Sequence, residues 1–123
     1  MDYGLSSELP EDDERQEIFR KQREERGFDD TELWGLDCVI AKFILPRLKE
    51  FKNQTGGGFP SDLGVEGDEN GDKGLDVWLN VIQEMIDAFE LIAKDHVVTD
   101  KKEKEIINKG LDQFRKYYFS LWN

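Results

Sequence analysis

Two pairs of acidic residues have a spacing that would allow them to hold a divalent metal ion. Glu84 and Asp87 lie three residues apart in one predicted helix, and Glu14 and Glu17 repeat this spacing near the start of the chain. Residues three apart share one face of a helix, so two such pairs on neighbouring helices can chelate Mg²⁺. Helices rich in Glu and Asp also produce such pairs by chance. The sequence therefore offers metal-dependent chemistry as a hypothesis, but it assigns no catalytic, cofactor-binding or metal-binding residue.

Other residues that could carry chemistry lack the partners they need. The single cysteine, Cys38, has no predicted general base beside it, because the only histidine, His96, falls between two predicted helices. We therefore interpret Cys38 as a buried structural thiol. The acidic run 68–72 begins like a calcium loop, but Lys73 and Leu79 occupy the positions that require Gly and Glu. We interpret this run as a solvated loop.

The segment FRKYYFSLW, residues 114–122, carries five aromatic residues at nine positions. One helix face cannot hold them all, so some of them must point away from the predicted core. Tyr, Trp and Arg are also the residue types that dominate protein-binding hot spots. Packing against a neighbouring helix is the alternative, since small bundles often close their ends with aromatics. The candidate partner-binding residues are Arg115, Tyr117, Phe119 and Trp122.

Three hydrophobic stripes with helical spacing predict the elements that position these residues. In each stripe, apolar side chains recur at steps of three and four and so lie on one side of a helix. The predicted helices span residues 29–51, 75–94 and 100–122, with the first of them at the centre. A charged helix over residues 11–26 precedes them and ends at Gly27. The stripes contain Trp34, Ile40, Phe43, Ile44 and Phe51; Trp78, Ile82, Met85, Ile86 and Phe89; and Ile107, Leu111, Phe114, Tyr118, Leu121 and Trp122.

The predicted fold is all-α, a bundle of three core helices plus a charged N-terminal helix. Residues 1–10 are predicted to form a mobile arm, and residues 11–123 a single helical domain. Asp29 and Glu32 have the spacing of a helix-capping pair. Residues 53–74 are rich in Gly and Asp and have no sustained periodicity, which predicts a long flexible loop between the second and third helices. A loop of this length is either functional or poorly ordered.

Composition limits the classes of function. The chain of 123 residues is 37% hydrophobic and 37% charged, which suits one domain with one core. Its net charge of −11 repels phosphate backbones and argues against direct nucleic-acid binding. The sequence shows neither a signal peptide nor an apolar run long enough to cross a membrane. With a lone cysteine, these features predict a protein of a reducing cytoplasm.

Three segments are recognisable as a set: RGFDDTELWGLDCVIAKFILPRLKEFK, VIQEMIDAFELIAKD and KGLDQFRKYYFSLW. Together they resemble a family of small uncharacterised proteins encoded by tailed bacteriophages, for which no activity is assigned. The likeness covers residues 26–52 and 75–122, leaving the acidic N-terminal segment and the glycine-rich loop outside it. The resemblance implies a phage origin and the cytoplasm of the infected bacterium as the site of action. It implies no functional residue.

These observations give a leading hypothesis and two alternatives. The leading hypothesis is a non-enzymatic interaction module that binds a host or phage protein and has no cofactor; a homo-oligomer is also compatible with its aromatic face. One alternative is a Mg²⁺-dependent all-α nucleotide pyrophosphohydrolase that uses the paired carboxylates. The other is an acidic nucleic-acid mimic that inhibits a DNA- or RNA-binding host protein. The phosphate-like charges of the mimic would be Glu11, Asp12, Asp13, Glu14, Asp68, Glu69, Asp72, Glu84 and Asp87.

Overall fold

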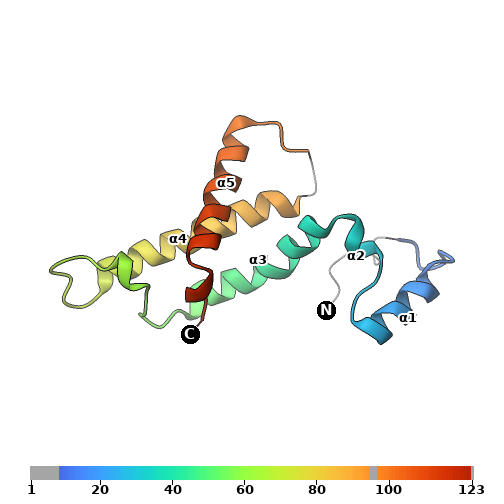
Figure 1. Cartoon of the computed structure of the whole chain (residues 1–123), viewed down its shortest axis with the longest axis horizontal. Helices are drawn as coiled ribbons and strands as arrows, with labels where there is room; N and C mark the ends of the chain where they lie inside the picture. Colours follow the sequence, from blue (N-terminus) through green and yellow to red (C-terminus); the bar gives the residue numbers. More distant parts are fainter. Residues whose placement is uncertain (1–8, 95–96, 123) are drawn as a thin grey trace.

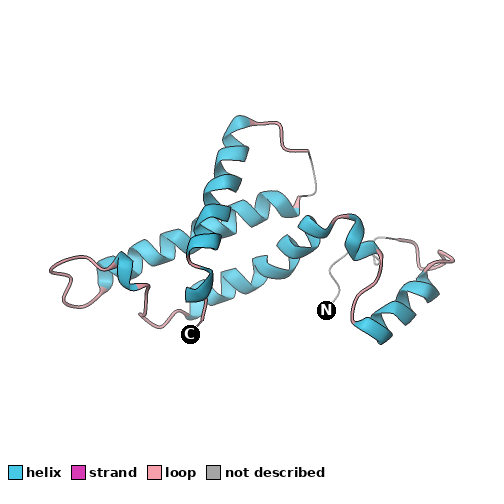
Figure 2. Cartoon of the chain, in the orientation of Figure 1, coloured by secondary structure: helices cyan, strands magenta, loops and turns pink. Residues whose placement is uncertain are grey.

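The chain folds into helices and loops, as the hydrophobic stripes predict. The computed structural model describes residues 9–94 and 97–122, and these ranges contain no strand (Figure 2). Residues 1–8 of the predicted arm and His96 lie outside the described ranges. In chain order (Figure 1), the elements are α1 (Gln16–Arg26), α2 (Thr31–Trp34), α3 (Leu36–Gln54), the 3₁₀ turn η2 (Ser61–Leu63), α4 (Asp72–Ala93), α5 (Lys101–Lys116) and the 3₁₀ turn η3 (Tyr118–Ser120).

The central helix is α4. It packs extensively against α3 and, separately, against α5, whereas α1 lies beyond α2 at the far end of the molecule (Figure 1). The predicted stripe of α4 is confirmed as its buried face, which is formed by Trp78, Ile82, Met85, Ile86 and Phe89. The prediction that residues 29–51 form the central helix is wrong. Apolar residues surround most of that helix, but α4 covers only one side of it.

The buried face of α3 matches the predicted stripe only in part, because Ile44 and Phe51 pack against the core whereas the other members are exposed. Cys38, Val39, Ala41 and Leu48 are buried, whereas Trp34, Ile40 and Phe43 are exposed. Both sets of residues have helical spacing, so periodicity alone does not identify the side that meets α4. Which side of α3 is buried depends on how α3 packs against the apolar face of α4.

The predicted helix 29–51 is divided at Gly35, whose backbone (φ −138°, ψ 61°) departs from helical geometry. The predicted capping pair is nevertheless formed at the start of α2. The Asp29 carboxylate accepts a hydrogen bond from the Thr31 N–H (2.9 Å), and Glu32 Oε2 accepts one from the Asp29 N–H (2.7 Å). These contacts satisfy backbone donors that have no partner within the helix.

α5 crosses α4 at a close approach centred on Gly110. A Cβ atom at this position would lie 2.3 Å from Ala88 Cβ and 2.4 Å from the Glu84 carbonyl oxygen. Only glycine allows the two helix backbones to come this near. Asp100 caps α5 by accepting a hydrogen bond from the Lys102 N–H (2.7 Å). The helix ends at Lys116 rather than near residue 122 as predicted.

Part of the predicted loop 53–74 is folded onto the helices. Phe59 packs over Gly74, where a Cβ atom would lie 2.4 Å from its ring. The Asp68 carboxylate accepts hydrogen bonds from the Gly74 N–H (3.0 Å) and the Lys73 N–H (3.3 Å), and these bonds lower the pKa of Asp68. Asp68 thus caps the first turn of α4. In the part of the chain that the structure describes, every helix is too short or too polar to span a bilayer.

Candidate partner-binding site

A row of edge-to-face aromatic contacts leads from the core to the C-terminal surface. Phe89 on α4 contacts Phe114 on α5 at a ring-centroid distance of 5.2 Å. Phe114 contacts Tyr118 at 5.6 Å, and Tyr118 contacts Phe119 at 5.4 Å. Edge-to-face pairs at these distances are favourable beyond the area they bury. The row therefore supports the exposed Phe119 from beneath.

The turn after α5 places neighbouring aromatic residues on opposite sides of the backbone. Tyr117 has non-helical dihedral angles (φ −108°, ψ 17°), and η3 follows it directly. The Ser120 N–H donates to the Tyr117 carbonyl oxygen (2.9 Å), which closes this turn. As a result, Tyr117 points into the molecule while Phe119 remains 90% exposed. A continuous α-helix to residue 122 would have placed these side chains differently.

Of the four candidate contact residues, Tyr117 is only 5% exposed, so its side chain belongs to the packing of the C-terminal turn and not to the surface. Its ring makes an edge-to-face contact with Trp78 at 5.5 Å. Its hydroxyl donates a hydrogen bond to Asp62 Oδ2 in the loop (2.9 Å). Lys116 Nζ lies 3.9 Å from the same oxygen and 5.2 Å from the Tyr117 ring. Tyr117 therefore joins the C-terminal turn to α4 and the loop, and it positions the exposed residues.

A cleft of about 610 Å³ lies between the end of α3, the glycine-rich loop and the C-terminal turn. Trp122, which is 75% exposed, lines this cleft, whereas Phe119 and Arg115 do not. Clefts lined by aromatic side chains with a few polar groups are typical of binding sites. The lining residues are Phe51, Gln54, Thr55, Gly56, Gly58, Phe59, Pro60, Trp78, Ser120 and Trp122.

The contribution of the loop to this cleft was not predicted from the sequence. Phe59 is a large apolar residue beside three consecutive glycines, and this isolated position was the available signal. Its ring is half-buried against the start of α4, and the exposed Gly56 and Gly58 line the cleft beside it. Arg115 is exposed in the last turn of α5, where a positive charge complements the helix dipole. We name Phe119 and Trp122 the C-terminal aromatic surface.

The carboxylate pairs that could have bound Mg²⁺ are not brought together. Glu84 Oε2 lies 3.4 Å from Lys109 Nζ of α5, and Asp87 accepts a hydrogen bond from Gln83 (2.8 Å). Glu17 pairs with Arg20 within α1, which lies beyond α2 and away from the crossing of α4 and α5 where Glu84 is found (Figure 1). Among residues 9–94 and 97–122, no group of three or more metal-binding side chains is found. These carboxylates form local ion pairs and hydrogen bonds.

Cys38 occupies a structural position. Its side chain is almost fully buried, and its Sγ lies 3.4 Å from the Ile92 carbonyl oxygen and 3.5 Å from that of Ala93. The thiol therefore donates to the last turn of α4, where carbonyl groups lack helical partners. This geometry agrees with the interpretation of Cys38 as a packed thiol between α3 and α4.

The acidic residues proposed for nucleic-acid mimicry are distributed over both ends of the molecule. The N-terminal group precedes α1, whereas the loop before α4 lies at the opposite end (Figure 1). Several of these charges are also paired. Hydrogen bonds from Arg15 lower the pKa of Asp13 to about 2, and Asp68 caps α4. The structure therefore divides the negative charge that a mimic would need on one face.

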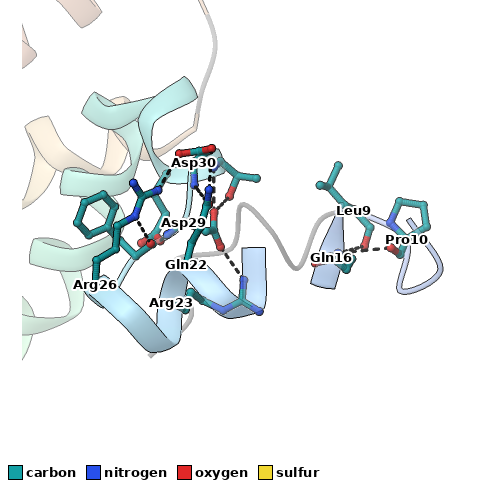
Figure 3. A network of polar contacts seen from close by, with 11 residues as sticks. Leu9, Pro10, Gln16, Gln22, Arg23, Arg26, Asp29 and Asp30 are labelled. Carbon is teal, nitrogen blue, oxygen red and sulfur yellow. Dashed lines mark hydrogen bonds and ion pairs between the residues drawn. The ribbon is translucent and has the colours of Figure 1, made fainter. Parts of the chain in front are cut away.

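A polar network holds α1 against α2 (Figure 3). Asp29 is only 1% exposed, and its carboxylate pairs with Arg23 NH1 at 2.6 Å while it also accepts from Thr31. Burying a carboxylate without such partners would be costly. The apolar part of this junction is formed by Phe19, whose ring makes an edge-to-face contact with Trp34 at 6.0 Å.

Asp30 forms the second half of the network. Gln22 donates to Asp30 Oδ2 and accepts from the Asp30 N–H, both at 2.9 Å. Arg26 NH2 donates to Asp30 Oδ1 at 2.7 Å. Hydrogen bonds from Gln22 and Arg26 lower the pKa of Asp30. These paired groups give the network the character of a structural joint between α1 and α2.

Comparisons with known proteins leave the site to be judged by its geometry. No protein-family model matches the chain, and no curated protein and no solved structure matches it.

Proposed function

We propose that this chain is a non-enzymatic protein-interaction module that binds a host or phage protein through its C-terminal aromatic surface. The observation that carries the proposal is the exposure of Phe119 (90%) and Trp122 (75%), with the Phe119 ring in edge-to-face contact with Tyr118. Large exposed aromatic side chains cost solubility, and they are enriched in the energetic centres of protein interfaces.

The arrangement supplies the two parts that a hot spot requires. Phe119 and Trp122 provide apolar area, and the cleft beside Trp122 provides a recess for a side chain of the partner. Gln54, Thr55 and Ser120 add polar groups at the wall of the cleft. Tyr117 anchors the turn that carries Phe119, which reduces the backbone entropy lost on binding.

The biological setting rests on the resemblance to small proteins of tailed bacteriophages. The segment nearest the proposed surface, KGLDQFRKYYFSLW, is one of the three that carry this likeness. We therefore place the protein in the cytoplasm of an infected bacterium. The partner would be a protein of the host or of the phage itself.

Affinity capture from a bacterial lysate tests this proposal when the variants are compared in parallel. The wild-type chain, Phe119→Asp and Val97→Asp would be immobilised, and the recovered proteins quantified by mass spectrometry. Val97 is also strongly exposed but is remote in sequence from the aromatic surface, so it controls for the loss of any apolar side chain. We expect a partner that Val97→Asp retains and Phe119→Asp loses. Equal recovery by all three proteins would contradict the proposal.

A further inference from the structure

The cleft beside the C-terminal aromatic surface has a wall made largely of aromatic rings. Its volume of about 610 Å³ is that of a ligand site, and the described residues that line it are all uncharged. Aromatic rings attract cations through the negative potential of their faces, and tryptophan does so most strongly. The lining therefore suits a positively charged group as well as an apolar one. The aromatic residues of the wall are Phe51, Phe59, Trp78 and Trp122.

The polar side chains of the cleft present hydrogen-bond acceptors. The Thr55 hydroxyl donates to the Phe51 carbonyl oxygen (2.8 Å), so the Thr55 oxygen can only accept from a ligand. The Gln54 amide nitrogen donates to Glu50 Oε1 (2.8 Å), and the Gln54 carbonyl oxygen is a second acceptor. A ligand that donates several N–H groups matches these acceptors, whereas an apolar side chain offers them no hydrogen.

The chain around the cleft is acidic. Residues 50–75 contain six acidic and two basic residues. Glu50 is exposed and is bonded to a lining residue, and the exposed Asp62 follows the part of the loop that lines the cleft. The nearby bases are engaged, because Lys52 donates to a glutamine of α4 (2.8 Å) and Lys116 Nζ lies 3.9 Å from Asp62 Oδ2. The charge of this region therefore favours a cationic ligand over a neutral or acidic one.

From this we infer that the cleft binds an arginine side chain in a basic segment of the partner protein. The inference rests on the proposed function, because it names the chemistry by which the partner is recognised. Arginine fits better than lysine, since its planar guanidinium stacks on aromatic rings, is more weakly hydrated than an ammonium group and donates N–H groups in several directions. One charge held against aromatic rings is screened only slightly by salt, so this mode of binding changes little with ionic strength.

The indole N–H signals of the tryptophans report binding in NMR spectra. Trp78 and Trp122 line the cleft, whereas Trp34 lies on α2 and serves as an internal reference. Three blocked peptides of glycine and serine, with arginine, citrulline or leucine at the centre, would be titrated into the millimolar range. We expect the arginine peptide to shift the signals of Trp78 and Trp122 but not that of Trp34. The citrulline peptide has the same shape without the charge, and it should bind about fivefold to tenfold more weakly, as should the leucine peptide.

Two pairs of matched variants test the site. Trp122→Ala should weaken binding of the arginine peptide, followed at Trp78, by about fivefold or more, whereas Trp34→Ala, at an exposed position of α2, should leave it unchanged. Glu50→Gln should weaken the arginine peptide by about twofold and leave the leucine peptide unaffected. Glu25→Gln removes an exposed charge of α1 and should change neither. Circular dichroism checks that each variant keeps the helical content of the wild type.

Equal binding of the arginine and citrulline peptides would overturn the inference, as would tighter binding of the leucine peptide. Unchanged Trp78 and Trp122 signals with every peptide would also overturn it.

The capture experiment judges the proposed function separately. A partner that Phe119→Asp loses, combined with no binding of the arginine peptide, would overturn the inference alone. Binding of the arginine peptide, combined with equal recovery by all captured forms of the chain, would overturn the proposed function and keep the cleft as an arginine site.

Discussion

At the scale of residues, Tyr117 joins three parts of the molecule. Its ring contacts Trp78 on α4, and its hydroxyl donates to Asp62 in the loop. The sequence suggested it as a contact residue because tyrosine is common in hot spots, but composition does not reveal which side of a turn a residue occupies. The non-helical backbone at Tyr117 decides this.

Tyr117→Phe removes the hydroxyl and keeps the ring. We expect unfolding in urea to show a loss of about 1 kcal/mol, since the Asp62 carboxylate is partly exposed and can bind water in its place. Tyr118→Phe is the matched control, because Tyr118 is exposed in the same turn. An equal effect of both substitutions would show that the hydrogen bond to Asp62 adds no stability.

At the scale of elements, the crossing of α4 and α5 depends on Gly110. Gly110→Ala would raise helix propensity, but the new methyl group would collide with Ala88 and the Glu84 carbonyl group. We expect a net loss of about 1–3 kcal/mol in the free energy of unfolding. Gly56→Ala is the control, because a Cβ atom there meets nothing within 4 Å. Stabilisation by Gly110→Ala would mean that the two helices are farther apart.

We expect the stability of the folded protein to depend on pH through Asp68, which caps the first turn of α4. The pKa of Asp68 is lowered chiefly by the hydrogen bond from the Gly74 N–H, so the charged form stabilises the folded state. This contribution is present above the unfolded pKa and is lost as pH falls through the lowered folded value. Asp68→Asn should therefore reduce Tm at neutral pH and narrow the difference in Tm between neutral and acidic solution. Asp76→Asn, at an exposed position of the same helix, should leave that difference nearly unchanged.

The elements show where sequence patterns are sufficient and where packing decides. The stripe of α4 was predicted correctly because one face of this helix is apolar and the opposite face carries exposed residues such as Asp76, Asn80 and Asp87. α3 has apolar residues on two faces, so periodicity could not select the buried one. The break at Gly35 and the close approach at Gly110 depend on backbone geometry, for which a glycine in the sequence is only a weak signal.

At the scale of the whole molecule, α1 is attached mainly by polar contacts and one buried ring. Arg23→Ala would remove the 2.6 Å ion pair between Arg23 and the buried Asp29 carboxylate. We expect hydrogen exchange of the α1 amides to accelerate by about tenfold or more, while the amides of α4 keep their protection. Arg20→Ala, which removes only exposed pairs with Glu17 and Glu24, should have little effect. Equal acceleration in α1 and α4 would show that the helices unfold as one unit.

The fold places the C-terminal aromatic surface beside the cleft that Trp122 lines. The candidate cleft could be predicted from sequence only in part, because Trp122 and Phe59 are separated by more than 60 residues and meet through the turn after α5. That turn has no strong sequence signal. The number of aromatic residues predicted that some of them point away from the core, and Phe119 does so, but the same reasoning applied to Tyr117, which is buried.

One measurement tests the central claim most directly. Calorimetry at low and high salt would give the affinity of a captured partner for the wild-type chain and for the variants Phe119→Asp and Trp122→Ala. We predict that Phe119→Asp and Trp122→Ala each weaken binding by about 2 kcal/mol or more, and that affinity changes little with salt. Two results together would contradict the claim and favour mimicry by the acidic segments: a wild-type affinity that falls steeply with salt, and variant affinities equal to that of the wild type.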